Sequence, residues 1–309
     1  MKKKAKKEEL EEQDNTKLET NEALEKIAKN EDNEEFEEFS DVNSNHSFKF
    51  IRKTIVIIIL LIVFFRFYGV SRIVTKEYSI IDEAILQGFD GAKIVQISDI
   101  HFGTTVNEAM LQKIVNKVNE LKPDIIVFTG DLIDKGINPT DKIKAEISVN
   151  LSKLTANIGK YAIASDEDLN NNDFTTLITN SGFTLLNNES TLIYNDFEEP
   201  IELVGLSNPN ESVSTTANYK IALIHKPDDT DSILNNNYNL ILAGHSHGGI
   251  IRLPFIGGLV RLEGAKKYYN DSYILDNTRL YISSGLGTSN INFRMFNQPS
   301  INLYRLYKN

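Results

Sequence analysis

The sequence predicts an α/β domain that follows a transmembrane helix and a charged, disordered N-terminal tail. From about residue 93 onward, runs of β-branched residues alternate with helical segments, which is the pattern of strands joined by helices. Residues 55–65 read IVIIILLIVFF without one polar side chain. Residues 1–50 hold 15 acidic residues and nine lysines with few apolar residues between them, so they cannot bury enough surface to fold. We therefore divide the chain into a tail (1–50), a transmembrane anchor (51–72), a linker (73–91) and a folded domain (92–309).

The composition excludes several classes of function. The chain of 309 residues has no Cys and five His, so disulfides, thiolate zinc sites, iron–sulfur clusters and Cys nucleophiles are ruled out. A net charge of -10 argues against a nucleic-acid partner, which would require a basic surface. Any metal must be bound by His, Asp, Glu or Asn.

The apolar run is interpreted as a single-pass membrane anchor. Extended to residues 54–70, it reaches about 25 Å as a helix, a short span in which Arg66 can extend to the interface. A buried core helix is the alternative, but the run has no polar face. A cleaved signal peptide is disfavoured because no small-residue cleavage site follows. Basic residues flank both ends equally, so the positive-inside rule gives no orientation.

Five segments of the predicted domain have the apolar character of buried strands. A helix with Met110 and Leu121 on its apolar face lies between the first two and ends before Pro123, which forms a βαβ unit. A second helix is expected over residues 141–156, and shorter antiparallel strands over residues 183–206. The five strands are expected at 93–98, 124–130, 220–224, 239–244 and 279–284.

Histidines and aspartates follow these strands directly, in the motifs SDIH, TGD, IHKPD and AGHSHGG. In open α/β sheets, ligands bind outside the carboxyl ends of strands, where separate strand exits converge. A lone His is usually structural, but two His separated by one residue and flanked by Gly favour a ligand site. His46, in the tail, is interpreted as solvated. The candidate ligands are Asp99, His101, Asp131, His225, His245 and His247.

Clustered His and Asp without Cys suit a divalent cation such as Mn, Zn, Fe or Mg, and a carboxylate can bridge two of them. Two such cations polarise a phosphoryl group and lower the pKa of a water molecule that attacks it. Hydrolysis of a phosphate ester then requires no protein nucleophile.

These motifs, in this order, resemble those of the calcineurin-like metallophosphoesterase superfamily over about residues 92–307. The segments 244–260 and 282–289 resemble more narrowly its membrane-anchored or exported bacterial branch, which includes enzymes that cleave the pyrophosphate of nucleotide-linked lipids. The resemblance implies a four-layer αββα sandwich and two divalent metal ions. It assigns Asp99, His101, Asp131 and His247 to the first metal and Asp131, His225 and His245 to the second, with Asp131 as the bridge.

One motif of the branch is altered in this chain. Where the branch has Gly-Asn-His-Asp, this sequence has Ser165, Asp166, Glu167 and Asp168. Asp166 replaces an Asn that ligates the second metal; it could still ligate, but it adds negative charge. Glu167 replaces a catalytic His, and an ionised carboxylate would repel phosphate and could not donate a proton. A polar turn that has drifted from the motif is the alternative interpretation.

Two functions therefore stay open. The first is a membrane-anchored, dimetal phosphohydrolase that cleaves a phosphodiester or pyrophosphate bond in a small-molecule or lipid-linked substrate. The second is a catalytically impaired protein of the same fold that binds metal and acts as a binding module. By resemblance, the catalytic domain is expected outside the cytoplasm, at the cell membrane.

Overall fold

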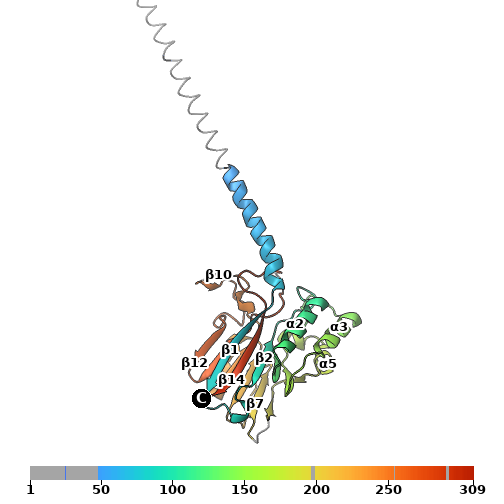
Figure 1. Ribbon diagram of the computed structural model, residues 1–309, viewed down its shortest axis with the longest axis vertical. Coiled ribbons are helices and arrows are strands. Elements are labelled where there is room, and N and C mark those ends of the chain that lie inside the picture. The colour runs from blue at the N-terminus through green and yellow to red at the C-terminus, as the bar shows by residue number, and fades with distance from the viewer. Residues whose placement is uncertain (1–24, 26–47, 196–198, 254, 290–291) are drawn as a thin grey trace, which may run out of the picture. The chain divides into compact units, whose positions relative to one another are not determined.

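The computed structural model describes residue 25 and residues 48–195, 199–253, 255–289 and 292–309 (Figure 1). The predicted tail lies almost entirely outside the described residues. The chain divides into two compact units, Met1–Ile62 and Val63–Asn309.

The predicted anchor is helical. One helix, Phe48–Ser71, comprises 24 residues and is the only helix in the described part of the chain that is long and apolar enough to cross a membrane. At about 1.5 Å per residue it is about 36 Å long, which exceeds the hydrocarbon thickness of a bilayer. Its apolar side chains from Ile55 to Phe64 are exposed, as expected for a segment whose solvent is lipid.

The domain contains two six-stranded sheets of mixed direction. The central pairs β2–β3 and β8–β9 are parallel, as the βαβ pattern predicts. The first sheet has the order β1 (Val74–Asp82), β14 (Ser300–Lys308), β2 (Lys93–Ile97), β3 (Ile125–Phe128), β4 (Gly159–Ala162) and β5 (Thr184–Leu185). The second has the order β12 (Ser272–Leu275), β13 (Thr278–Ile282), β9 (Leu240–Ala243), β8 (Lys220–Ile224), β7 (Ile201–Leu206) and β6 (Glu189–Ile193).

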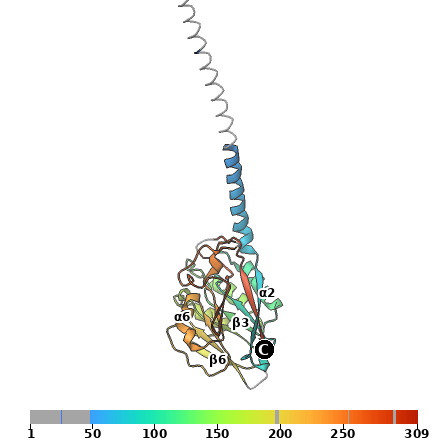
Figure 2. The ribbon, with the colours of Figure 1, turned by 90° about the vertical axis from the view of Figure 1, so that its left-hand side faces the viewer.

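Helices cover the outer faces of both sheets. On the first sheet lie α2 (Glu108–Glu120), α3 (Asp141–Leu151) and α5 (Phe174–Asn180). On the second lies the short α6 (Thr230–Ile233), and Figure 2 shows α6 and α2 on opposite sides of the domain. The Asn107 side chain caps α2 by accepting a hydrogen bond from the Met110 N–H, at 3.0 Å.

The core confirms the predicted four-layer αββα sandwich. Alternate residues of β2 and β3 face opposite layers: Val95 and Ile126 pack under the helices of the first sheet, whereas Ile94 and Ile125 pack between the two sheets. A third cluster lies between the second sheet and α6. This alternation follows from the two-residue period of a strand buried on both faces.

Three segments differ from the pattern expected of them. The helix expected over residues 141–156 ends at Leu151, with Ser152 as its C-cap. Residues 73–91, expected as a linker, contain β1 and a 3-10 turn, η1 (Gln87–Phe89); β1 pairs in parallel with the carboxyl-terminal strand β14. The sequence VTKEYSIID has charged residues within it, and only Ile80 of this edge strand is buried, so the apolar run of a buried strand is missing. Within residues 183–206, β6 and β7 pair antiparallel as expected, but β5 pairs in parallel with β4.

Candidate metal centre

The candidate ligands lie where the central strands end. Asp99 and His101 follow β2, Asp131 follows β3, His225 follows β8, and His245 and His247 follow β9. Because β2 and β3 belong to one sheet and β8 and β9 to the other, side chains from both sheets meet at this edge. A 3-10 turn, η4 (His247–Gly249), and the short helix α4 (Asp166–Leu169), which follows β4, complete the loops around it.

Five of these six residues have a backbone conformation that residues other than glycine rarely adopt. Their φ angles are positive, in the left-handed region that costs free energy for residues other than glycine. Strained backbone persists where the surrounding structure holds it and is concentrated at functional sites. The residues are Asp99 (50°), His101 (43°), Asp131 (63°), His245 (64°) and His247 (45°).

The six side chains form two clusters. In the first, ligand atoms of Asp99, His101 and His247 lie within 4.8 Å of one another; in the second, those of Asp131, His225 and His245 do the same. The facing Nε2 atoms of His101 and His247 are 3.1 Å apart. In the second cluster, His245 Nδ1 lies 3.2 Å from His225 Nε2.

Asp131 joins the two clusters. Its Oδ2 lies 3.4 Å from His101 Nε2 and 3.3 Å from His225 Nε2. Asp131 is only 4% exposed, and its Oδ1 is buried without a hydrogen-bond partner among the described residues. A buried carboxylate oxygen without a partner is costly, and a divalent cation would satisfy it. The donor set therefore fits a divalent metal.

The charges of the cluster are coupled through Asp131. Although burial opposes it, His225 and then His101 hold the pKa of Asp131 well below its ordinary value. Burial, followed by the neighbouring His101 and Arg294, lowers the pKa of His247 well below its ordinary value, so Asp131 is ionised and His247 neutral, the forms that bind metals. Against burial, Asp131 in turn raises the pKa of His225 to about 10, so a cation that binds His225 must displace its proton.

All four histidine rings of the site have a polar neighbour at the second nitrogen, which is a hydrogen-bond partner for three of them and an ion-pair contact for His101. His225 Nδ1 lies 2.8 Å from the Thr129 carbonyl oxygen, and His245 Nε2 lies 2.6 Å from that of Glu263. His101 Nδ1 lies 3.3 Å from Asp134 Oδ1, and Arg294 lies 3.2 Å from His247 Nδ1. Such outer partners fix the ring that binds a metal.

No sequence pattern pointed to Asp134 or Arg294, and Asp168 was named only as the last residue of the altered motif, without a role. Asp134 lies three residues after Asp131, and this proximity was the available signal. Arg294 is completely buried and lies 47 residues from His247, so no local pattern reveals it. Asp168 is also buried and accepts hydrogen bonds from the backbone N–H groups of Asp131 (2.7 Å) and Leu132 (3.0 Å).

The structure separates the two altered residues of the Ser165–Asp168 turn. The Asp166 carboxylate is 63% exposed and forms an ion pair with Lys226; it belongs to none of the three potential metal-binding groups in the described part of the chain. Glu167 instead belongs to the third group, with His101 and Asp131. Its Oε2 is buried without a partner among the described atoms, and burial, then Asp131, raises its pKa.

Comparison with known proteins agrees with this geometry. The family model for calcineurin-like phosphoesterases matches residues 92–249. The uncharacterized metallophosphoesterase YkuE of Bacillus subtilis is 33% identical over 258 residues, which covers 77% of this chain and 89% of the relative. The UDP-2,3-diacylglucosamine pyrophosphatase LpxG of Chlamydia muridarum is 25% identical, covering 70% and 83%. A transmembrane protein with metallophosphoesterase domain of Danio rerio is 26% identical, covering 71% and 54%.

The chain belongs to the calcineurin-like phosphoesterase family. It is a metal-dependent phosphoesterase, and its Asp and His clusters at the strand ends are the candidate metal-binding residues.

Proposed function

We propose that the protein is a membrane-anchored phosphohydrolase that uses two divalent cations to cleave a phosphodiester or pyrophosphate bond of a lipid-linked substrate. The observation that carries this proposal is the position of Asp131, whose carboxylate lies within 3.4 Å of His101 and 3.3 Å of His225. A carboxylate shared by two ligand clusters is what a dimetal site requires.

Each cation has its own protein ligands in this proposal. Asp99, His101 and His247 would hold the first and His225 and His245 the second, with Asp131 shared between them. Bound there, divalent cations would supply polarisation of the phosphoryl group and a lowered pKa of the attacking water. The chain positions the ligands by strained strand ends and by the outer partners of each histidine. No nucleophilic side chain is needed.

Glu167 supplies a further carboxylate to the cation held by His101 and Asp131. Its unpartnered oxygen and its place in the third ligand group support this role. A hollow of about 440 Å³ opens beside it and is also lined by Asp134 and Lys135. The Lys135 ammonium would attract the phosphate of a substrate that enters there.

The lipid-linked substrate is the finer part of the proposal. The apolar helix Phe48–Ser71 would hold the centre near the bilayer, and a relative carries the name of a pyrophosphatase for a diacylated nucleotide sugar. We place the catalytic domain outside the cytoplasm. Protease added to intact cells should then remove the domain, whereas removal of the tail alone would contradict this orientation.

A binding module with impaired catalysis is the second candidate. It is favoured by the position of Asp166, which faces Lys226 instead of the metal clusters, and by the carboxylate of Glu167 where the branch has a histidine. In this function the clusters would still hold metal, but phosphate would be bound without turnover.

One assay separates the two functions. The full chain in detergent is incubated with Mn and bis-p-nitrophenyl phosphate, beside Asp131→Ala and the double variant Asp166→Asn, Glu167→His. The full chain is used because a truncation that begins within β1 would remove part of the strand that pairs with β14. Turnover that depends on Mn and is lost in Asp131→Ala supports the hydrolase. Turnover only in the double variant supports the binding module.

A further inference from the structure

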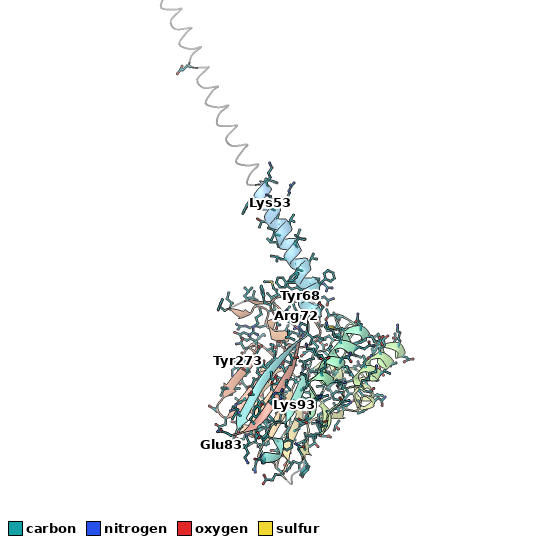
Figure 3. The ribbon with its side chains drawn as sticks, in the orientation of Figure 1. Lys53, Tyr68, Arg72, Glu83, Lys93 and Tyr273 are labelled. Atoms are coloured by element: carbon teal, nitrogen blue, oxygen red, sulfur yellow. The ribbon has the colours of Figure 1, made fainter. Side chains whose placement is uncertain are left out.

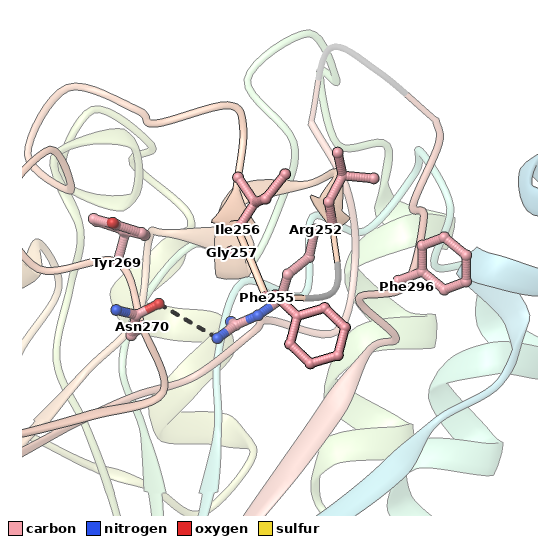
Figure 4. A pocket seen from close by; sticks show the side chains of 8 residues that line it. Arg252, Phe255, Ile256, Gly257, Tyr269, Asn270 and Phe296 are labelled. Atoms are coloured by element: carbon pink, nitrogen blue, oxygen red, sulfur yellow. Dashed lines mark hydrogen bonds between the residues drawn. The ribbon is translucent and has the colours of Figure 1, made fainter.

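The hairpin after the His245–His247 motif carries an apolar surface that the proposed chemistry does not use. It is formed by β10 (Arg252–Leu253) and β11 (Gly257–Gly258), which pair antiparallel. Phe255 and Ile256 lie at its tip and Leu259 follows it, with exposed fractions of 109%, 67% and 52%. Phe296 is 57% exposed. Together with Phe255 and Ile256 it lines a hollow of about 470 Å³ (Figure 4). We call these four residues the hairpin surface.

This surface is continuous with the end of the apolar helix. The Phe65 ring lies 5.1 Å from that of Phe296 and 6.4 Å from that of Phe293, both edge to face. Phe65 belongs to the same compact unit as the domain and also to the helix that is long enough to span a membrane. Phe296 therefore lies at the level where that helix meets the domain.

Polar aromatic and basic side chains mark this level as a membrane interface. Tyr68 lies about one helical turn after Phe65. The Arg72 guanidinium donates to the Tyr68 hydroxyl at 2.7 Å, and both residues are labelled in Figure 3. Beside the hairpin, the Arg261 guanidinium lies 3.9 Å above the ring of Tyr269. Tyr and Arg at the edge of an apolar surface are typical of the headgroup region of a bilayer.

The hairpin is joined to the metal centre through residues 294–297. The Arg252 N–H donates to the Met295 carbonyl oxygen at 2.9 Å, which ties the hairpin to this segment. From the same segment, Arg294 lies 3.2 Å from His247 Nδ1, and the Asn297 amide donates to the His247 carbonyl oxygen. A lipid contact made by the hairpin would therefore hold His247 close to the bilayer.

The backbone of the hairpin also packs directly on the metal-binding loop. A Cβ atom added to Gly249 would lie 2.6 Å from the Gly258 Cα. The two backbone segments therefore approach more closely than a side chain at position 249 would allow. The hairpin thus leaves the metal-binding loop with little freedom to move independently.

From these contacts we propose that the hairpin surface is a second membrane contact, which inserts Phe255 and Ile256 into the lipid interface beside the anchor. The occupant is the bilayer itself. The apolar side chains would enter the boundary between headgroups and acyl chains, to a depth of about 5–10 Å. The metal centre would then face phosphates at the membrane surface, while the lipid part of a substrate stays in the bilayer.

The absence of cysteine from the sequence makes a direct test straightforward. A single cysteine is introduced as Ile256→Cys in the full chain, labelled with an environment-sensitive fluorophore and reconstituted in vesicles of anionic and zwitterionic phospholipid. The matched control is Leu192→Cys on β6, a residue 40% exposed, because β6 pairs with β7 and β7 lies at the end of the domain opposite β10 (Figure 1). Lipids with a quencher near the headgroup should reduce emission at 256 roughly two-fold and leave 192 unchanged.

This inference rests on the membrane anchorage in the proposed function, and pelleting of the labelled chains with vesicles measures that anchorage separately. Chains that pellet but show equal quenching at 256 and 192 would overturn the hairpin contact alone. Chains that do not pellet would overturn both it and the anchorage. A 256 signal that changes only when another protein is added would also overturn it, in favour of a protein partner. None of these readouts depends on turnover.

Discussion

The exits of β3 and β4 are neighbours in one sheet, yet they present their acidic side chains differently. After β3, Asp131 takes a left-handed backbone, with φ of 63°, and directs its carboxylate between the two histidine clusters. After β4, Ser165 caps α4 in a reciprocal capping box with Asp168. That cap leaves Asp166 exposed against Lys226 and places Glu167 beside Asp131.

The comparison shows that the scaffold of this turn and its chemistry are separable. Asp168 still holds the backbone N–H groups of Asp131 and Leu132, so the turn retains its link to the bridging carboxylate. The two side chains that would act on a metal or a phosphate have different chemistry. Substitutions at the two exits should therefore affect different properties.

The largest effect is expected for Asp131→Asn. The change removes a charge shared by both clusters, so both cations should bind more weakly. Removing an outer partner of a metal ligand costs about 10- to 100-fold in affinity, and we expect the loss of the bridge to exceed about 100-fold. Isothermal titration with Mn checks this. An affinity equal to that of the native chain would show that Asp131 is not a ligand.

Asp168→Ala should mainly reduce stability. Its carboxylate is buried and accepts three backbone hydrogen bonds, from Ser165, Asp131 and Leu132. Leaving such donors unsatisfied costs about 1–3 kcal/mol each before the structure relaxes, so we expect a loss of roughly 3 kcal/mol in the free energy of unfolding. Thermal unfolding in detergent measures it, with the fully exposed Asp141→Ala as control. A melting temperature equal to the control would contradict this role.

Glu167→Gln should have a smaller effect, and that effect should be on the affinity for metal. An amide oxygen is a weaker ligand than a carboxylate, so Mn affinity should fall by about 10-fold while the melting temperature of the metal-free chain stays the same. Glu167→Asp, which keeps the charge on a shorter stem, is the matched control and should lose less. Equal Mn affinity in Glu167→Gln and the native chain would remove Glu167 from the ligand set.

Asp166→Ala should have the smallest effect. Its ion pair with Lys226 is largely exposed, and such pairs contribute about 0–1 kcal/mol. Mn affinity should change less than about two-fold, because the carboxylate pairs with Lys226 and belongs to none of the potential metal-binding groups in the described part of the chain. A loss as large as that of Glu167→Gln would show that Asp166 turns toward the metal when it binds.

The sequence predicts the strand exits well because their physics is local. Apolar β-branched runs end at Asp99 and Asp131, and the chain must turn where such a run stops. Strand β1 is harder to predict, because it is held by pairing with β14 at the other end of the chain. Arg294 and Asn297 act on His247 from 47 and 50 residues away, a distance that no sequence pattern covers.

The altered turn is an intermediate case. Its position relative to the Gly-Asn-His-Asp motif predicts that residues 165–168 lie beside the candidate metal centre, and the structure brings Glu167 near His101 and Asp131. The direction of each side chain depends on the capping box of α4 and on the ammonium of Lys226, which follows a strand of the other sheet. Only the three-dimensional structure brings these together.

The proposed bridging of two cations by Asp131 can be seen by anomalous scattering from crystals of the full chain soaked in Mn. A bridging Asp131 should give two peaks roughly 3.5–4 Å apart, with Asp131 between them, one beside His101 and His247 and the other beside His225 and His245. A single peak, or two peaks that Asp131 does not touch, would contradict it.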